Sequence, residues 1–220
     1  MTTPAIIVAV DGAAGSGKST LARGLARALG VAYVNTGLMY RALAAASIRA
    51  EAGADDAESL VDLARGLRFT LAGEDPPELE VEGYTGDELT TPEVESRVSV
   101  VARHPAVRAL MRDLQRTLGA RGAVMEGRDI ATVVFPAAPL RVFLLASERE
   151  RGDRRARERG SADTATVRDA IRERDARDAR TNRLEPAPGA VVIDTSDRSV
   201  DETLDTALQH ARRIWPEDTR

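Results

Sequence analysis

Short apolar runs alternate with segments of helical periodicity in the first third of the chain. Residues 5–10 (AIIVAV) are a continuous apolar run rich in β-branched side chains, which predicts a strand buried on both faces of a parallel sheet. Apolar positions then recur at helical spacing over residues 18–29, and Gly30 is placed to end that helix. A short strand is expected at 32–34, a second helix at 38–52 and a third helix within 57–65.

The pattern changes after this third helix. Residues 68–71 and 78–81 alternate polar and apolar side chains around a turn that contains Gly73 and two prolines. Such a pattern predicts an antiparallel hairpin set into the α/β chain. Helical patterns resume at 92–103 and 105–118.

The second half of the chain returns to alternating strands and helices. Apolar runs predict buried strands at 123–125, 140–145 and 190–193. Two Ser-x-x-Glu patterns, starting at Ser147 and Ser199, predict capping boxes that open an arginine-rich helix and a final helix ending near Trp215. Another helix is expected at roughly 164–177. Strands that alternate with helices in this way predict an α/β fold with three layers around a central parallel sheet.

Composition narrows the classes of protein that this chain can belong to. Its 220 residues are the size of one domain. The absence of cysteine excludes disulfides, a thiolate zinc site and a cysteine nucleophile. A net charge of −4 argues against bulk binding of nucleic acid, and the apolar runs are too short to span a membrane. Without a recognisable secretory signal, the chain is expected to be a cytoplasmic enzyme.

Arginine is far more abundant than lysine, since the only lysine is Lys18 and the other 30 basic residues are arginines. Residues 148–183 hold 12 arginines against 9 acids, which is a local net charge of +3. Most of these arginines are expected to form ion pairs on solvated helix faces, and a few to reach an anionic ligand. The single lysine marks a position where a compact ammonium group on a flexible stem is needed.

That lysine lies in a complete phosphate-binding motif. Residues 12–19 (GAAGSGKS) fit G-x-x-x-x-G-K-[ST] without a mismatch, after a predicted strand and before a predicted helix. Glycines allow backbone N–H groups to turn toward phosphate oxygens, and the helix N-terminus adds its positive dipole. Lys18 can reach the outer phosphates of a nucleoside triphosphate, and the hydroxyl of Ser19 can bind Mg²⁺. The residues expected to bind the triphosphate are Gly12, Ala13, Ala14, Gly15, Ser16, Gly17, Lys18, Ser19 and Thr20.

Three classes of enzyme share this loop. A GTPase needs Asn-Lys-x-Asp to read guanine, but neither Asn35 nor Asn182 is followed by lysine. A motor or transport ATPase has an apolar strand that ends in aspartate, whereas the strand at 140–145 leads to Ser147. The third class, a small-molecule kinase, needs a second anion site beside the first.

Two further segments predict that second anion site. Thr36-Gly37-x-x-Tyr40-Arg41 follows the second strand, and Glu126-Gly127-Arg128-Asp129 follows the strand at 123–125. The carboxyl ends of parallel strands meet at one edge of the sheet, so these segments are expected to converge beside the phosphate-binding loop.

These motifs resemble the bacterial-type cytidylate (CMP/dCMP) kinases over nearly the whole chain. The resemblance rests on the phosphate-binding loop, NTGxxYR at 35–41, the hairpin near 67–90, EGRDIATVVFP at 126–136 and RDxxD at 174–178. It implies a P-loop NTPase fold with a small antiparallel insert that binds the nucleoside monophosphate (NMP) and a mobile helical lid. The implied single kinase domain has a core at 1–36, 104–147 and 189–220, an NMP-binding region at 37–103 and a lid at 148–188.

The resemblance also implies an activity and roles for individual residues. The family transfers the γ-phosphoryl group of ATP, with Mg²⁺, to CMP or dCMP, and the chain is expected to act on these substrates as a monomer without nucleic acid. By similarity, Thr36, Arg41 and Arg128 clamp the CMP phosphate, and Ser99, Arg108 and Asp129 read cytosine. Arg174 and Asp178 contact the ribose and phosphate from the lid. The residues expected to act in catalysis are Lys18, Arg128 and Arg174.

The chain departs from the family pattern at three positions. Asn35 stands where Asp is usual, Ala131 where Gly is usual, and Thr181 where the lid usually has an arginine. Arg180 or Arg183 is a candidate to replace that arginine. Two alternatives remain at this point: another P-loop kinase, such as one acting on UMP or AMP, and a regulatory or RNA-interacting protein that uses the arginine-rich lid.

Overall fold

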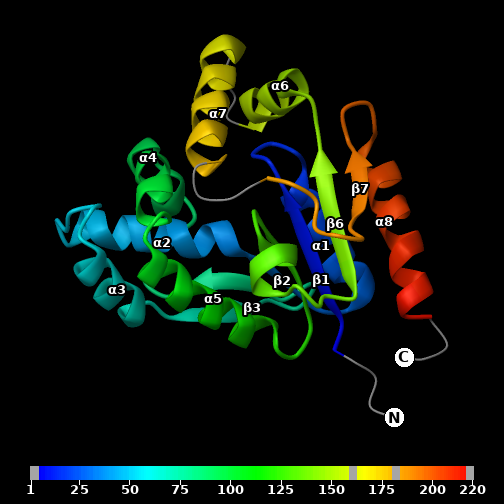
Figure 1. The fold of residues 1–220 in the computed structure, drawn as a ribbon, viewed down its shortest axis with the longest axis horizontal. Helices are drawn as coiled ribbons and strands as arrows, with labels where there is room; N and C mark the ends of the chain where they lie inside the picture. Colours follow the sequence, from blue (N-terminus) through cyan, green and yellow to red (C-terminus); the bar gives the residue numbers. More distant parts are fainter. Residues whose placement is uncertain (1–4, 159–162, 180–183, 217–220) are drawn as a thin grey trace.

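A seven-stranded sheet organises the protein, as Figure 1 shows. The computed structural model describes residues 5–158, 163–179 and 184–216, and the strand order is β3-β4-β2-β5-β1-β6-β7. All neighbouring strands run parallel except β3 and β4, which form the predicted antiparallel hairpin. The strands are β1 (Ile7–Gly12), β2 (Ala32–Asn35), β3 (Phe69–Ala72), β4 (Glu78–Val81), β5 (Ala123–Gly127), β6 (Leu140–Leu145) and β7 (Val191–Asp194).

The helices cover both faces and the carboxyl edge of this sheet. The α-helices are α1 (Lys18–Leu29), α2 (Thr36–Arg49), α3 (Ala57–Gly66), α4 (Pro92–Val101), α5 (Pro105–Gly119), α6 (Glu148–Glu158), α7 (Thr164–Ala179) and α8 (Val200–Ile214). A 3₁₀ turn occupies Glu88–Thr90 and a single π-helical turn occupies Ile130–Val134. None of the helices in the described ranges is long and apolar enough to span a membrane.

Two hydrophobic clusters produce the three layers. Val8 and Val10 of β1 face one way and pack with α1, α8 and Trp215. Ala9 faces the other way and packs with α2, α3, α4 and α5. This alternation follows from the period of two along a strand. The strand predicted at 5–10 is observed two residues later, at Ile7–Gly12, and it is buried on both faces as predicted. The three-layer α/β class is confirmed.

The predicted hairpin extends the main sheet. Strand β4 pairs in parallel with β2 through Tyr33 and Glu78, and the Tyr33 N–H donates to the Pro77 carbonyl at 2.8 Å. Arg23 of α1 also forms an ion pair with Glu78 at 2.5 Å. The antiparallel insert is thus joined to the core at the outer edge of β2.

Helix caps agree with the sequence at α8 and differ at α6. Ser199 and Glu202 form the complete capping box predicted for α8. At Ser147 only half of the box is present, because the Glu150 N–H donates to the Ser147 hydroxyl at 3.2 Å. The Glu150 carboxylate instead accepts from Arg154 at 2.9 Å. The expectation of a full box at Ser147 was therefore wrong, because the Ser147 N–H donates to the Ser196 hydroxyl at 2.9 Å and not to Glu150.

Helices α6 and α7 lie beyond the arrowheads of β6 and β7 in Figure 1. They pack on each other through Ala156, Val167 and Ile171. Arg168 of α7 also pairs with Asp153 of α6 at 2.6 Å. This helix pair stands over the carboxyl edge of the sheet, which is the edge where the sequence places the chemistry.

Candidate active site

The phosphate-binding loop joins β1 to α1 with its predicted geometry. Gly17, the N-cap of α1, adopts the left-handed conformation with φ of 88°, which glycine reaches without strain. No side chain caps this helix, so its first N–H groups face the loop. Lys18 is buried, and its Nζ donates to the Ala13 carbonyl at 2.6 Å, which folds the side chain back over the loop. The loop therefore presents backbone donors and one ammonium group to an anion.

Asp11, which the sequence analysis did not identify, fixes the neighbouring segment. Its carboxylate accepts from the backbone N–H groups of Ile130 at 2.8 Å and Ala131 at 2.7 Å. Burial raises the pKa of Asp11 to about 6, although the two N–H groups lower it. Asp11 thus joins the end of β1 to the π-helical turn after Asp129. An acid that ends an apolar strand directly before a phosphate loop is the signal that could have revealed it.

Thr36 lies on the other side of the loop, at the first position of α2. Its hydroxyl donates to the Glu126 carbonyl at 2.7 Å, which joins the ends of β2 and β5. A Cβ atom at Gly127 would lie 2.7 Å from this hydroxyl, so only glycine fits there. Asn35 caps α2 by accepting from the Leu38 N–H at 3.2 Å. The departure at position 35 therefore keeps a good helix cap.

Arg41 is held beside the loop by two partners. Its Nη1 donates to the Leu89 carbonyl and its Nη2 to Glu95, both at 3.0 Å. Glu95, on α4, also accepts from Arg155 of α6 at 2.5 Å. One carboxylate of α4 therefore links an arginine of α2 to an arginine of α6.

Arg128 connects three segments at the centre of the site. Its Nε pairs with Asp178 of α7 at 3.0 Å, and its Nη1 donates to the Gly12 carbonyl at 3.1 Å. The next residue, Asp129, forms an ion pair with Arg108 of α5. Ser99 of α4 accepts from Arg177 of α7 at 3.1 Å. The predicted substrate residues from α2, α4, α5, α7 and the β5 loop thus converge around one space.

That space is a cavity of about 550 Å³. It brings together most of the residues predicted from the sequence: Ala14, Gly15, Lys18, Ser19, Thr36, Arg41, Ser99, Arg108, Arg128, Asp129 and Asp178. A second cavity of about 780 Å³ opens at Ser99, Arg108 and Asp129 and is also lined by Tyr40. Burial raises the pKa of Tyr40 to about 12, so this phenol stays neutral at physiological pH.

Five residues of the predicted loop do not line this cavity, and two of them, Gly12 and Ala13, do not line the neighbouring cavity at α8 either. Ser16, Gly17 and Thr20 line a separate cavity of about 370 Å³ between α1, α6 and the start of α8. Arg174 belongs to α7, but its side chain lies outside the described part of the structure. Arg180, Thr181 and Arg183 also lie outside the described residues.

The donor set around the cavity fits a magnesium ion held mainly by a nucleotide. Ser19 is exposed and lines the cavity beside Lys18. No group of three histidine or acidic residues able to enclose a metal occurs within residues 5–158, 163–179 and 184–216. Mg²⁺ in phosphoryl-transfer sites keeps waters and binds phosphate oxygens with one or two protein ligands.

Comparisons with known proteins give a consistent result. Residues 8–213 match the family model described as cytidylate kinase. A cytidylate kinase of Thermus thermophilus is 42% identical, over 94% of this chain and 99% of its own. One from Roseiflexus castenholzii is 43% identical, over 86% of this chain and 85% of its own. A solved structure of an uncharacterized protein from Eubacterium ventriosum superposes with a TM-score of 0.50 at 14% identity, over 93% of this chain and 97% of that one, which shows a shared fold alone.

Proposed function

The chain belongs to the cytidylate kinase family and therefore phosphorylates CMP and dCMP, and we propose that the 550 Å³ cavity is the place where this transfer occurs. One observation carries the proposal: this cavity joins Lys18 and Ser19 of the phosphate-binding loop to the arginines of a second anion site. A kinase for a nucleotide acceptor needs two polyanion sites that share one space.

On the donor side, the loop residues 12–20 hold the phosphates of ATP. Lys18 binds the outer phosphates, and its position at the start of α1 places it where the helix dipole also favours negative charge. The Ser19 hydroxyl would hold Mg²⁺, which would supply positive charge that neutralises the phosphates during transfer.

On the acceptor side, Thr36, Arg41 and Arg128 bind the phosphate of CMP. Arg128 contacts both the loop carbonyl of Gly12 and Asp178 of α7, so it lies between donor and lid. An attacking phosphate oxygen needs little help from a base, but two polyanions must be brought together. Arg41 and Arg128, on two different elements, supply the required neutralisation and orientation.

At the base end of the cavity, Ser99, Arg108 and Asp129 read cytosine. A carboxylate can accept a hydrogen bond from the 4-amino group of cytosine, whereas uracil presents an oxygen at that position. Asp178 and Arg174 act from the lid on the ribose and phosphate. The corresponding regions are a core at 1–36, 104–147 and 189–220, an NMP-binding region at 37–103 and a lid at 148–188. We also propose a monomeric, cytoplasmic enzyme that acts on free nucleotides.

The test is a measurement of ADP formed from ATP and Mg²⁺ with CMP, dCMP, UMP, AMP or no acceptor. CMP and dCMP are expected to give the highest rates. Rates with CMP and dCMP equal to the acceptor-free blank would overturn the proposal. A higher rate with UMP or AMP would assign the chain to another acceptor.

A further inference from the structure

Thr195, directly after β7, joins the phosphate-binding loop to the sheet. It is buried, and its backbone N–H donates to the Leu145 carbonyl at 2.8 Å. Its hydroxyl lies 3.2 Å from the Ser16 carbonyl and 3.1 Å from the Leu145 carbonyl. A hydroxyl has one hydrogen to donate and two lone pairs that accept. Thr195 therefore shares its hydrogen between the loop and β6 and keeps acceptor capacity for a third group.

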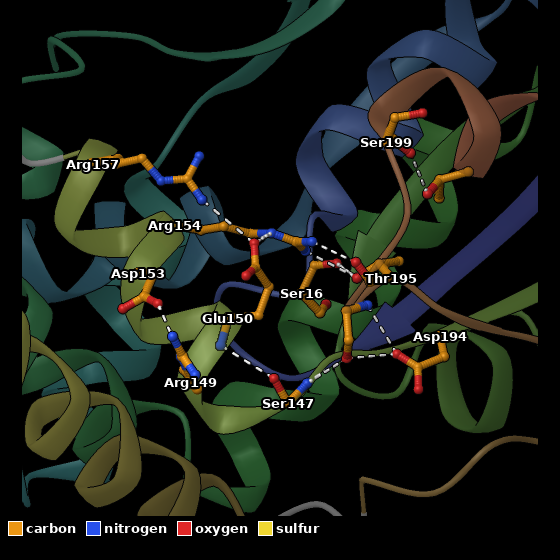
Figure 2. A network of polar contacts seen from close by, with 12 residues as sticks. Ser16, Ser147, Arg149, Glu150, Asp153, Arg154, Arg157, Asp194, Thr195 and Ser199 are labelled. Atoms are coloured by element: carbon orange, nitrogen blue, oxygen red, sulfur yellow. Dashed lines mark hydrogen bonds and ion pairs between the residues drawn. The ribbon is translucent and has the colours of Figure 1, made fainter.

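That third group is Arg154 of α6, as Figure 2 shows. Nη1 of Arg154 donates to the Thr195 hydroxyl at 2.9 Å, and Nη2 donates to the Thr195 carbonyl at 2.5 Å. Its Nε donates to Glu150 at 2.9 Å. All three guanidinium nitrogens are thus bonded, which fixes the plane of this rigid group. Thr195 supplies two of these three contacts.

These contacts hold the Arg154 guanidinium directly against the phosphate-binding loop. A Cβ atom at Gly17 would lie 3.6 Å from Nη1 of Arg154, so the guanidinium rests against the residue before Lys18. Ser16, Gly17, Arg154 and Thr195 line the separate 370 Å³ cavity. None of these four residues lines the cavity that holds Arg41 and Asp129.

From this geometry we propose that Thr195 is a positioning residue for the phosphoryl donor. It holds Arg154 of the lid helix against the outer side of the phosphate-binding loop and fixes the Ser16 carbonyl at the same time. A fixed positive charge then lies beside the donor nucleotide, whereas the acceptor site is unaffected. The inference rests on the proposed function, because it assumes that the loop binds ATP.

The first test compares Thr195→Val with Thr195→Ser. Valine keeps the branched shape and loses the hydroxyl, whereas serine keeps the hydroxyl. Thr195→Val is expected to raise the KM for ATP by about tenfold, the size of one lost hydrogen bond to a charged group, with the KM for CMP unchanged within about twofold. Thr195→Ser is expected to restore the KM for ATP to within about threefold of the wild type.

Thr206→Val is the matched control. The Thr206 hydroxyl also donates to a backbone carbonyl, that of Glu202 at 2.7 Å, and also accepts from an arginine, Arg198 at 3.1 Å. It is half-buried on α8 and contacts no residue of the phosphate-binding loop among its described hydrogen bonds. Its KM for ATP is expected to match the wild type.

Arg154→Ala provides a second route that leaves Thr195 in place. It is expected to raise the KM for ATP by at least as much as Thr195→Val. The increase in the double variant is expected to be less than the product of the two single increases, because Arg154 acts through Thr195, while the bond from Thr195 to the Ser16 carbonyl is lost only when Thr195 is replaced. Three outcomes would each overturn the inference. They are a Thr195→Val variant with a normal KM for ATP, a Thr195→Val variant whose KM values for ATP and CMP rise equally, and additive effects of the Thr195 and Arg154 substitutions in the double variant. Wild-type protein that forms no CMP-dependent ADP would instead refute the proposed function.

Discussion

Replacing Asp129 with alanine tests how the site distinguishes CMP from UMP. Asp129 pairs with Arg108 at the base end of the cavity, and the two side chains are only 17% and 21% exposed. A hydrogen bond to a charged group in such a site contributes roughly 1.5–3 kcal/mol. We therefore expect the ratio of kcat/KM for CMP to that for UMP to fall by about 10- to 150-fold.

Most of this change is expected to come from a loss with CMP. Uracil never makes the hydrogen bond to Asp129, and removing the carboxylate also removes a repulsion from its O4 oxygen. The kcat/KM for UMP is therefore expected to stay constant or to rise. The KM for ATP is expected to remain unchanged, because Asp129 is held by Arg108 at the base end of the cavity, whereas ATP is expected to bind the loop at Lys18 and Ser19.

The assay is ADP release at varied CMP or UMP, followed by chromatographic separation of the nucleotides. Asp62→Ala is the matched control, since Asp62 also pairs with an arginine, Arg65 at 3.0 Å, but does so on an exposed face of α3. An unchanged CMP-to-UMP ratio in a folded Asp129→Ala variant would remove Asp129 from base recognition. An equal loss with both acceptors would point to a structural role for its pair with Arg108.

Three further predictions concern the loop, the acceptor arginine and the buried acid. Lys18→Arg keeps the positive charge but not the compact ammonium group that donates to the Ala13 carbonyl. Turnover is therefore expected to fall by about 100-fold or more, while the melting temperature stays unchanged. Near-normal turnover would show that the positive charge alone is sufficient. Arg41→Ala is expected to raise the KM for CMP by about tenfold and leave that for ATP alone, and weaker ATP binding alone would invert the two-site assignment. Burial raises the pKa of Asp11 from 3.8 to about 6. Ionisation of this carboxyl group therefore lowers the free energy of unfolding by about 3 kcal/mol. This loss of stability is absent below about pH 4 and complete above about pH 6. Urea unfolding at pH 4.5 and 7.5 is therefore expected to show wild type losing stability relative to Asp11→Asn as pH rises; a difference that does not change with pH would contradict the assignment.

Much of the fold could be predicted because local signals agreed with long-range packing. The helix at 18–29 was predicted with its observed bounds, since a glycine in the left-handed conformation stands at each end, Gly17 and Gly30. The strand at 140–145 and the hairpin strand at 78–81 also have their predicted bounds. In these places, periodicity, turn residues and burial all favour one structure.

Other features depend on contacts that no local pattern encodes. The π-helical turn at Ile130–Val134 forms beside Asp11, which accepts from two of its N–H groups across 119 and 120 residues of sequence. The pairing of β4 with β2 joins segments that both read as ordinary strands. Thr195 gave no signal at all, because a threonine after a strand is common and its partners come from the loop and the lid.

The pairing of β4 with β2 has a mechanical consequence. Any swing of the NMP-binding region as a rigid body would have to pull the Pro77 carbonyl away from Tyr33 and separate Arg23 from Glu78. The proposed lid, by contrast, contacts α4 through side chains such as that of Arg155, which pairs with Glu95 and can separate from it without breaking a backbone hydrogen bond. Opening for substrate exchange is therefore expected to move α7, which meets α4 and the β5 loop through the side chains of Arg177 and Asp178. The hairpin is expected to stay anchored to the sheet, and Arg154 to keep α6 beside the phosphate-binding loop.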